Sequence, residues 1–272
     1  MSMIQKQRSI NKLISVIIPA FRQQKTIARD IRRIEKVLKQ LRYKFEMIVV
    51  VDGNIDNTFD RAKKLASSVI KVFGYQHNRG KGYAIRYGMV RSKGNIIAFI
   101  DSGMDLNPNG LSMLLEHFEW YNADIIVGSK RHPVSKVVYP FDRKILSFLS
   151  QLYIRFLFGL NIRDTQVGMK FFRRDVIKDV LPRLLVKKFA FDIEVLVIAY
   201  YLGYKKIFEA PIEVRHKFEG SIVSQNLLPI IFNTFIDTLG IFYRLKVLHY
   251  YDDVSKRKWV FDPELRFRIS KT

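Results

Sequence analysis

The chain has 272 residues, with 47 lysines and arginines against 25 acidic residues, a formal net charge of +22 and no cysteine. The lack of cysteine excludes disulfides, thiolate metal sites and cysteine nucleophiles, and an apolar content of 48% excludes a wholly disordered chain. So positive a charge indicates an anionic partner, which can be nucleic acid, a membrane surface or a phosphorylated small molecule.

The sequence contains no segment that we expect to span a membrane or to direct secretion. Residues 1–12 lack the apolar core of a signal peptide, and no run of about 18 apolar residues is free of charge. The most apolar segment, Leu227–Tyr243, is interrupted by polar residues and is predicted as a buried helix or as an interfacial helix on a bilayer. We therefore expect a cytoplasmic protein that is soluble or peripheral at the cytoplasmic face of a membrane.

The first 130 residues alternate between strand-like and helix-like patterns. Short runs rich in Val and Ile predict buried strands, and apolar residues at helical spacing predict helices between them. The predicted strands are residues 14–19, 45–51, 69–75, 95–100 and 123–128, and the predicted helices are residues 26–42, 58–67, 82–92 and 111–121. This alternation indicates an α/β fold with an open, mostly parallel sheet covered by helices on both faces.

Beyond residue 133 the alternation weakens. The predicted elements are helices at 145–158 and 191–204, a polar loop feeding a strand at 164–174, and a last strand at 206–214. No flexible linker separates the two halves, so we expect a single continuous domain. Its main unit is expected over residues 1–220, followed by a C-terminal helical extension over residues 221–272 that can lie on a membrane surface.

The positive charge is concentrated in two stretches. Residues 1–44 carry 12 basic and 2 acidic side chains, and residues 127–188 carry 14 and 4. The first stretch is largely a helix face, for which a solvated surface and a functional role both stay open. The second stretch lies where the regular strands are expected to have ended, so it is the better candidate for an anion site.

Acidic residues at predicted strand ends are candidate ligands, because open parallel sheets bind ligands beyond the carboxyl ends of their strands. Asp52 ends the second predicted strand, where it can cap the next helix or bind a ligand. Asp101 and Asp105 follow the fourth, and two carboxylates on one turn can bind a Mg²⁺ or Mn²⁺ ion that bridges a nucleotide diphosphate. The glycine-flanked loop NRGKG can hold a phosphate through its backbone N–H groups, Arg79 and Lys81.

These residues lie in stretches that resemble family 2 glycosyltransferases of the GT-A (Rossmann-like) fold, and in particular the dolichol-phosphate mannose and glucose synthase group. The matching stretches are SVIIPAF (15–21), VVVDGNIDNT (49–58), NRGKGYAIRYGM (78–89), FIDSGMDLNP (99–108), VGSKRHP (127–133), DTQVGMKFFRRDV (164–176) and FAFDIEVLVIAYYLGY (189–204). Each motif is modest alone, but seven in the family's order within residues 13–220 make a specific signal.

The resemblance implies an inverting transfer of a sugar from a nucleotide sugar, such as GDP-mannose or UDP-glucose, to a polyprenyl (dolichyl-type) phosphate at a membrane surface. Because the acceptor phosphate is already anionic, it needs a basic cradle rather than a strong general base. The assigned roles are donor binding for Pro19, Ala20, Phe21, Asp52, Arg79, Lys81 and Asp101, metal binding for Asp101 and Asp105, acceptor-phosphate binding for Lys130, Arg131, Arg173, Arg174, Arg215 and Lys217, and catalysis for Asp101, Asp105 and Arg131. Nucleic acid is not expected as a partner, because no binding motif accompanies the charge.

The chain departs from the family pattern at three acidic positions on the donor side. Gln23 replaces the glutamate of the first motif, Val51 the first of two aspartates, and Gly103 the second aspartate of Asp-x-Asp. That last aspartate is a metal ligand in the family, so Asp105 or nearby arginines are the candidate replacements. Two alternatives stay open: a glycosyltransferase of the same fold with a saccharide or protein acceptor, and a catalytically impaired protein that binds a nucleotide sugar or a lipid phosphate.

Overall fold

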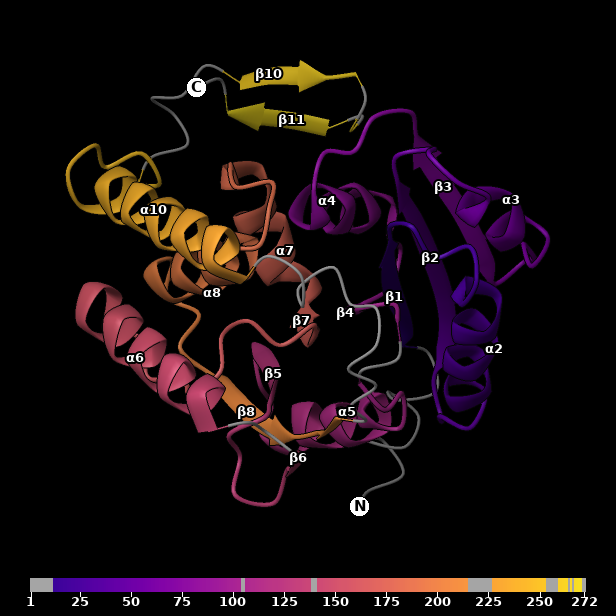
Figure 1. The fold of residues 1–272 in the computed structure, drawn as a ribbon, viewed down its shortest axis with the longest axis horizontal. Helices are drawn as coiled ribbons and strands as arrows, with labels where there is room; N and C mark the ends of the chain where they lie inside the picture. The colour runs from indigo at the N-terminus through magenta and orange to yellow at the C-terminus, as the bar shows by residue number, and fades with distance from the viewer. Residues whose placement is uncertain are drawn as a thin grey trace.

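A computed structural model describes residues 12–103, 106–137, 141–214, 227–252, 259–263, 265 and 267–270. The first half alternates strands and helices as the hydrophobic pattern predicts (Figure 1). In chain order its elements are β1 (Leu13–Ala20), α2 (Ile27–Leu38), β2 (Lys44–Asp52), α3 (Thr58–Lys63), β3 (Ile70–Tyr75), α4 (Lys81–Arg91), β4 (Ile96–Ile100), α5 (Gly110–Trp120) and β5 (Ile125–Ser129). The predicted elements of this half are confirmed, with helix ends that shift by a few residues.

The second half mixes helices with short strands. Its elements are β6 (Lys136–Val137), α6 (Phe141–Phe158), β7 (Met169–Arg173), α7 (Arg174–Val180), the 3-10 helix η1 (Leu181–Arg183), α8 (Phe191–Tyr201), β8 (Ile207–Pro211), β9 (Glu213–Val214), α10 (Leu227–Lys246), β10 (Trp259–Asp262) and β11 (Phe267–Ser270). The single last strand expected at 206–214 is two strands, because β8 joins the main sheet whereas β9 pairs with β6. The helix predicted over Leu227–Tyr243 is confirmed within α10.

Within the described residues, seven strands form the main sheet in the order β3-β2-β1-β4-β7-β5-β8. β1, β2, β3 and β4 run parallel, and β5 is parallel to β8. β7 alone is antiparallel, and it lies between β4 and β5. The mostly parallel sheet is therefore confirmed, but the expectation that strands end before the second basic stretch is wrong, since β7 lies inside that stretch.

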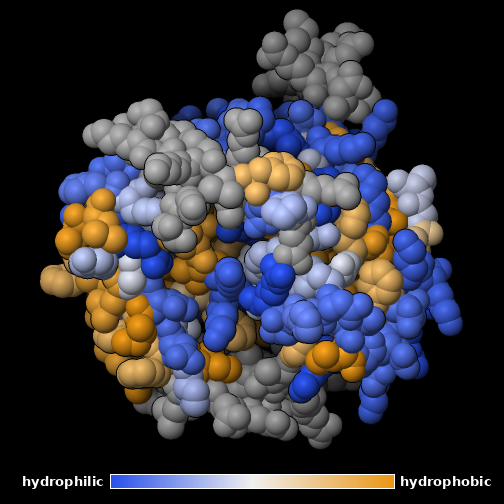
Figure 2. All heavy atoms as spheres, turned by 90° about the horizontal axis from the view of Figure 1, so that it is seen from above, coloured by the Kyte–Doolittle hydropathy of each residue, from blue (hydrophilic) through white to orange (hydrophobic). Residues whose placement is uncertain are grey.

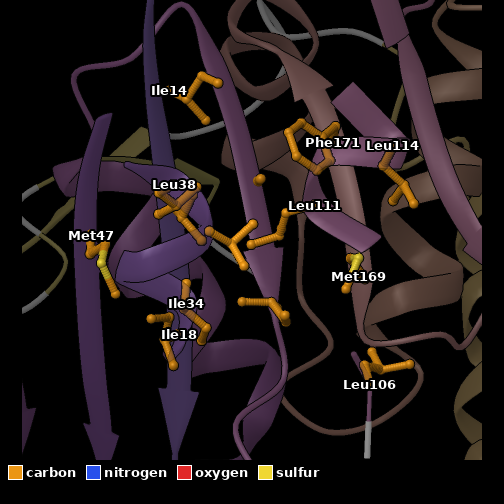
Figure 3. Close-up of a cluster of buried hydrophobic side chains, with 14 of the residues drawn as sticks. Ile14, Ile18, Ile34, Leu38, Met47, Leu106, Leu111, Leu114, Met169 and Phe171 are labelled. Atoms are coloured by element: carbon orange, nitrogen blue, oxygen red, sulfur yellow. The ribbon is translucent and has the colours of Figure 1, made fainter. Parts of the chain in front are cut away.

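Helices cover both faces of this sheet. Apolar residues recur every three or four positions along α2, so one face of that helix is buried against the sheet. Leu38 of α2 and Leu111 of α5 pack with Phe171 of β7 in one buried cluster (Figure 3). On the other face, Ile85 of α4 and Leu196 of α8 belong to a second buried cluster. The sheet is buried on both sides, which explains its nearly continuous apolar strands.

α6 and α10 lie side by side at the edge of the molecule (Figure 1). The rings of Tyr153 and Phe235 stack with their centroids 4.8 Å apart, and Phe158 meets Phe242 edge-on at 6.1 Å. α10 also contacts α8, which ties the pair to the domain. In the part of the chain that the structure describes, no helix is both long enough and apolar enough to cross a membrane.

Candidate active site

The carboxyl ends of β1, β2 and β4 meet at one edge of the sheet, because these strands run parallel and are hydrogen-bonded neighbours. β2 ends at Asp52, and Asp101 directly follows β4. β5 runs in the same direction as β4, since both are antiparallel to β7. The loop after β5, which carries Lys130 and Arg131, therefore also lies at this edge. The sheet thus gathers most of the predicted site residues along one rim.

Asp52 holds the glycine-flanked loop rather than capping the helix that follows it. Its Oδ1 accepts hydrogen bonds from the Tyr75 hydroxyl (2.9 Å) and from the backbone N–H of Arg79 (2.7 Å). Its Oδ2 accepts from the Asn78 side chain (2.9 Å) and from the backbone N–H of Gly80 (3.0 Å). The carboxylate is buried and both oxygens have donors. Asp52 therefore fixes the loop that leads into α4.

Gly80 and Gly82 allow this loop to lie directly against the segment before α8. Gly80 has φ +100°, and a Cβ there would lie 2.6 Å from the carbonyl oxygen of Lys187. A Cβ on Gly82 would lie 2.4 Å from Cβ of Phe191. A hydrogen bond from the Tyr83 N–H to the Lys187 carbonyl (3.0 Å) joins the two segments at this contact. The glycines thus serve close packing, and this packing places Lys81 at the start of α4.

The turn at residues 101–103 is fixed from three sides. The N–H of Asp101 donates to the Gly168 carbonyl (2.8 Å), and the Ser102 hydroxyl donates to the Pro19 carbonyl. The N–H of Gly103 donates to Oδ2 of Asp30 (3.2 Å), a buried residue of α2. Burial raises the pKa of Asp30 against the opposing effect of its hydrogen bonds. The loop before β7, β1 and α2 together hold this turn in place.

Gly168 leaves room for the Asp101 side chain. A Cβ at position 168 would lie 1.8 Å from Oδ2 of Asp101 and 2.1 Å from its Cγ. No residue with a Cβ therefore fits at position 168 unless the Asp101 carboxylate moves. The glycine of the DTQVGMKFF stretch is therefore part of the site.

Four charged side chains form a continuous row of ion pairs at this edge. Lys81 Nζ lies 2.9 Å from Oδ2 of Asp101 and 3.2 Å from Oδ2 of Asp192. The other oxygen of Asp192 pairs with Nζ of Lys170, which also donates to the Val167 carbonyl (2.6 Å). Lys170 and Asp192 are both buried. Two ammonium groups and two carboxylates thus balance each other across β4, β7, α4 and α8.

The pKa values of the side chains in this row of ion pairs follow from burial and from the paired charges. Burial opposes the charge of Lys81, yet Asp101 and Asp192 raise the pKa of Lys81 above its ordinary value. Burial likewise opposes the charge of Asp192, but Lys170 and Lys81 hold the pKa of Asp192 below its usual range. For Lys170, burial dominates and lowers the pKa. The ion pairs therefore keep Lys81 and Asp192 charged near neutral pH.

The residues that follow β1 line the same rim. Ala20 is buried at the end of β1, and the Arg22 guanidinium lies 5.3 Å from the ring centroid of Phe21. The Arg79 guanidinium lies 4.9 Å from the ring centroid of Tyr83 and donates to its hydroxyl (3.1 Å). An aromatic and cationic rim of this kind suits a nucleotide base and its phosphates. Of the predicted donor residues, Pro19, Ala20, Phe21, Asp52, Arg79, Lys81 and Asp101 all lie at this edge.

Asp101 fits a divalent cation. Its Oδ1 is buried and, among the residues that the structure describes, has no hydrogen-bond partner, which leaves an acceptor for a ligand. Mg²⁺ sites commonly combine one or two carboxylates with substrate phosphates and water. Within the described residues no three acidic or histidine side chains converge, and Asp105 lies outside them. The residues therefore suit a cation whose coordination is completed by phosphate oxygens.

Lys130 and Arg131 are tied to the segments on the α6 side of the site. The N–H of Lys130 donates to Oδ2 of Asp164 (3.1 Å). Nη1 of Arg131 donates to the side chain of Gln151 on α6 and to the carbonyl of Arg163 (3.2 Å). These contacts link the rim of the sheet to α6. The remaining acceptor candidates after β9, Arg215 and Lys217, lie outside the described residues.

Arg173 and Arg174 are not brought to this edge, which corrects their assignment to the acceptor phosphate. Because β7 is antiparallel, Arg173 pairs with Ile96 at the amino end of β4, the edge opposite Asp101. There Nε of Arg173 donates to the Ala123 carbonyl (2.7 Å), and Nη2 of Arg174 donates to the Ser92 carbonyl (2.9 Å). Both arginines fasten the far edge of the sheet.

Lys170 was not predicted as a site residue. From its place in the FAFDIEVLVIAYYLGY stretch, Asp192, like Glu194, can either orient sugar hydroxyls or cap a helix. A signal for both was present, because each is a charged residue in a mainly apolar segment, MKFF in one case and FAFDIEVLVIA in the other. A charge in such a segment is buried only with a partner. The partner of each could not be identified from the sequence, since they are 22 residues apart.

Known proteins with similar sequences transfer sugars to polyprenyl phosphates, according to their names. The dolichyl-phosphate beta-glucosyltransferase of Dictyostelium discoideum is 29% identical over 74% of this chain and 67% of its own length. The human dolichyl-phosphate beta-glucosyltransferase is 32% identical over 71% of this chain and 64% of its own length. The chain thus spans about two thirds of the length of these relatives.

Solved structures share the fold. Mannosyl-3-phosphoglycerate synthase of Rubrobacter xylanophilus superposes with a TM-score of 0.66 at 15% identity, covering 96% of this chain and 84% of that protein. Glucosyl-3-phosphoglycerate synthase of Mycobacterium tuberculosis superposes with a TM-score of 0.65 at 17% identity, covering 96% and 90%. The family model described as glycosyl transferase family 2 matches residues 15–181. The chain therefore belongs to glycosyltransferase family 2.

Proposed function

We propose that this protein transfers a sugar, with inversion, from a nucleotide sugar to a polyprenyl phosphate at a membrane surface. The observation that carries the proposal is the Lys81–Asp101 ion pair (2.9 Å) at the carboxyl edge of the sheet, beside the loop held by Asp52. A carboxylate and an ammonium group side by side suit a diphosphate with its metal ion. The relatives named dolichyl-phosphate beta-glucosyltransferase support the same reaction.

On the donor side, the nucleotide would lie along the rim formed by Pro19, Ala20, Phe21 and the loop held by Asp52, with Arg79 near the phosphates. A Mg²⁺ or Mn²⁺ ion held by Asp101 and Asp105 would neutralise charge on the leaving diphosphate. Lys81 contributes a positive charge at the start of α4, where the N-terminal end of the helix also favours anions. UDP-glucose is favoured over GDP-mannose by the names of the relatives.

On the acceptor side, Lys130 and Arg131 would receive the lipid phosphate, together with Arg215 and Lys217. The phosphate oxygen is itself the nucleophile, so the residues need to lower the repulsion between two anions rather than remove a proton. Arg131 is held by Gln151 of α6 and by the Arg163 carbonyl, which orients its guanidinium. This makes Arg131 the strongest candidate among the acceptor residues.

The lipid tail and the bilayer would meet α6 and α10. Both helices expose large apolar side chains, including Phe156 at 88% and Phe232 at 64% of full exposure. Figure 2 shows hydrophobic residues gathered on the left of the molecule, the side where α6 and α10 lie in Figure 1. An exposed apolar surface beside a basic rim suits a peripheral protein on anionic lipid. We place this contact on the cytoplasmic face, where nucleotide sugars are available.

The test is sugar transfer by the purified chain. With UDP-glucose, a polyprenyl phosphate and Mg²⁺ or Mn²⁺, we expect a lipid-linked glucose, detected by mass spectrometry, whose β configuration is seen by nuclear magnetic resonance. Asp101→Asn should lower the rate at least about 100-fold, because it removes a charge that acts on the leaving group. Asp60→Asn, on the exposed surface of α3, is the matched control and should leave the rate unchanged.

Two outcomes would contradict the proposal. The first is no lipid-linked product from UDP-glucose, GDP-mannose or UDP-N-acetylglucosamine with either metal. The second is a glycosylated saccharide or protein formed in place of the lipid product. That result would show that the acceptor is not a polyprenyl phosphate, while the proposed nucleotide-sugar donor would stand.

A further inference from the structure

One lysine contacts two acidic residues at the carboxyl edge of the sheet. Lys81 Nζ lies 2.9 Å from Asp101 and 3.2 Å from Asp192, and most of its side chain is buried. A carboxylate already paired with an ammonium group attracts a second cation less strongly. Under the proposed function Asp101 is a metal ligand, so Lys81 and the metal ion depend on the same carboxylate.

Asp192 gives Lys81 a second partner that does not change. Asp192 is buried against Lys170, whose ammonium also donates to the Val167 carbonyl (2.6 Å). Because this pair is enclosed, Asp192 stays in place when Asp101 takes another ligand. Lys81 can then leave Asp101 without becoming a buried, unpaired charge. The site thus has the parts for an exchange of partners.

We propose that Lys81 is a built-in competitor for the divalent cation at Asp101, and that the diphosphate of the nucleotide relieves this competition. An arriving diphosphate attracts the ammonium group of Lys81. Lys81 is the first residue of α4, and the N-terminal end of a helix also favours anions. Movement of Lys81 toward the diphosphate frees Oδ2 of Asp101 next to Oδ1, which has no hydrogen-bond partner within the described part of the chain. The metal and the nucleotide consequently bind together, and the metal alone binds weakly. This inference rests on Asp101 being the metal ligand of the proposed function.

The experiment measures two binding constants with the full chain. Mn²⁺ binding without nucleotide is followed by electron paramagnetic resonance of the free ion, and UDP binding in EDTA by calorimetry. In Lys81→Met, Mn²⁺ should bind about tenfold more tightly and UDP about tenfold more weakly. The signs are opposite because one ammonium group repels the first ligand and attracts the second. Lys36→Met, an exposed change on α2 with the same loss of charge, should alter neither constant by more than about twofold.

Lys81→Gln is the second variant, because it removes the charge and keeps a donor for both carboxylates. It should change both constants in the same directions as Lys81→Met. Mn²⁺ affinity that is unchanged or weaker in the folded variants would overturn the inference. So would Mn²⁺ binding that survives Asp101→Asn in the Lys81→Met background. Neither readout requires sugar transfer, so an inactive protein with these affinities would refute the proposed function and leave the competition intact.

Discussion

At the scale of single residues, the Asp192–Lys170 pair is the most constrained feature of the site. Both side chains are buried, so contacts within the protein replace water around their charges. These contacts are the ion pair between the two residues, the ion pair of Asp192 with Lys81, and the hydrogen bond from Lys170 to the Val167 carbonyl. Such a pair adds little stability compared with an apolar pair, but loss of one partner leaves a buried charge. The pair therefore positions Lys81 at a cost that the surrounding fold has to offset.

Asp192→Asn should lower the free energy of unfolding by about 3 kcal/mol, because it strands the buried ammonium of Lys170. Adding Lys170→Met in the same chain should recover at least half of this loss, since the stranded charge is removed. Urea denaturation followed by circular dichroism measures both. Asp175→Asn, an exposed change on α7, should cost less than about 0.5 kcal/mol. Equal losses in the Asp192 and Asp175 variants would mean that the buried pair is not charged.

At the scale of elements, α6 and α10 lie at the edge of the molecule and expose apolar side chains to solvent. Their facing sides are joined by aromatic contacts, and their other sides expose residues such as Leu149, Phe156 and Phe232. Arg131 joins this pair to the rim of the sheet through Gln151. A bilayer on this side would therefore bring an anchored lipid phosphate near Lys130 and Arg131, the residues proposed to bind it.

Phe156→Ser and Phe232→Ser should each weaken binding to vesicles that contain anionic lipid by about tenfold, because each removes a large apolar group from the proposed contact. Flotation of the full chain with such vesicles measures the bound fraction. Trp120→Ser is the control, since Trp120 is 87% exposed but lies on α5, which packs on the sheet. A loss of binding in the Trp120 variant that equals the loss in the other two would move the membrane contact away from α6 and α10.

At the scale of the whole molecule, the two edges of the sheet have different tasks. The carboxyl edge collects the charged site residues, whereas the opposite edge is fastened by buried polar contacts. There Glu46 accepts from the Ser15 hydroxyl (2.7 Å), from Lys71 Nζ (2.6 Å) and from the N–H of Lys93 (2.6 Å). Arg174 adds a bond to the Ser92 carbonyl at the same end (2.9 Å). Glu46 and Arg174 thus hold together the edge of the sheet opposite the site.

Glu46 predicts how stability depends on pH. Burial opposes its charge, but Lys71, Ser15 and the Lys93 N–H lower the pKa of Glu46. A lowered pKa in the folded state contributes stability above the pKa of the unfolded chain, about 4.3, and that contribution is lost as the pH falls through the folded value. Glu46→Gln should therefore cost about 2 kcal/mol at pH 7, and the difference from wild type should shrink toward pH 3.

Denaturation of both proteins over this pH range is the measurement. Glu116→Gln serves as control, because the Glu116 side chain is half exposed in its ion pair with Arg42 (3.0 Å), and it should cost less than about 0.5 kcal/mol at any pH. A Glu46 variant whose deficit is the same at pH 7 and pH 3 would show that packing, not charge, explains its effect.

Much of the fold could be predicted from the sequence, because hydrophobic periodicity is a local property. The runs at Ile14–Pro19 and Phe45–Val51 predict β1 and β2, and Asp52, which follows the second run, lies at the same edge of the sheet as Asp101. The direction of β7 could not be predicted in this way. The residue pattern of a short apolar strand does not indicate whether it runs parallel or antiparallel to its neighbours. Only the antiparallel pairing of β7 with β4 and β5 decides at which edge of the sheet Arg173 and Arg174 lie.

By itself, the sequence determined the alternation of strands and helices, the excess of positive charge and the family of the chain, since all three are properties of residues and their order. Only the tertiary structure decided which charges meet. Lys81 and Asp192 are 111 residues apart and come within 3.2 Å, and the Asp101 carboxylate fits only because Gly168 lies beside it. The reason is physical: burial and ion pairing depend on distances in space, which no local pattern of residues encodes.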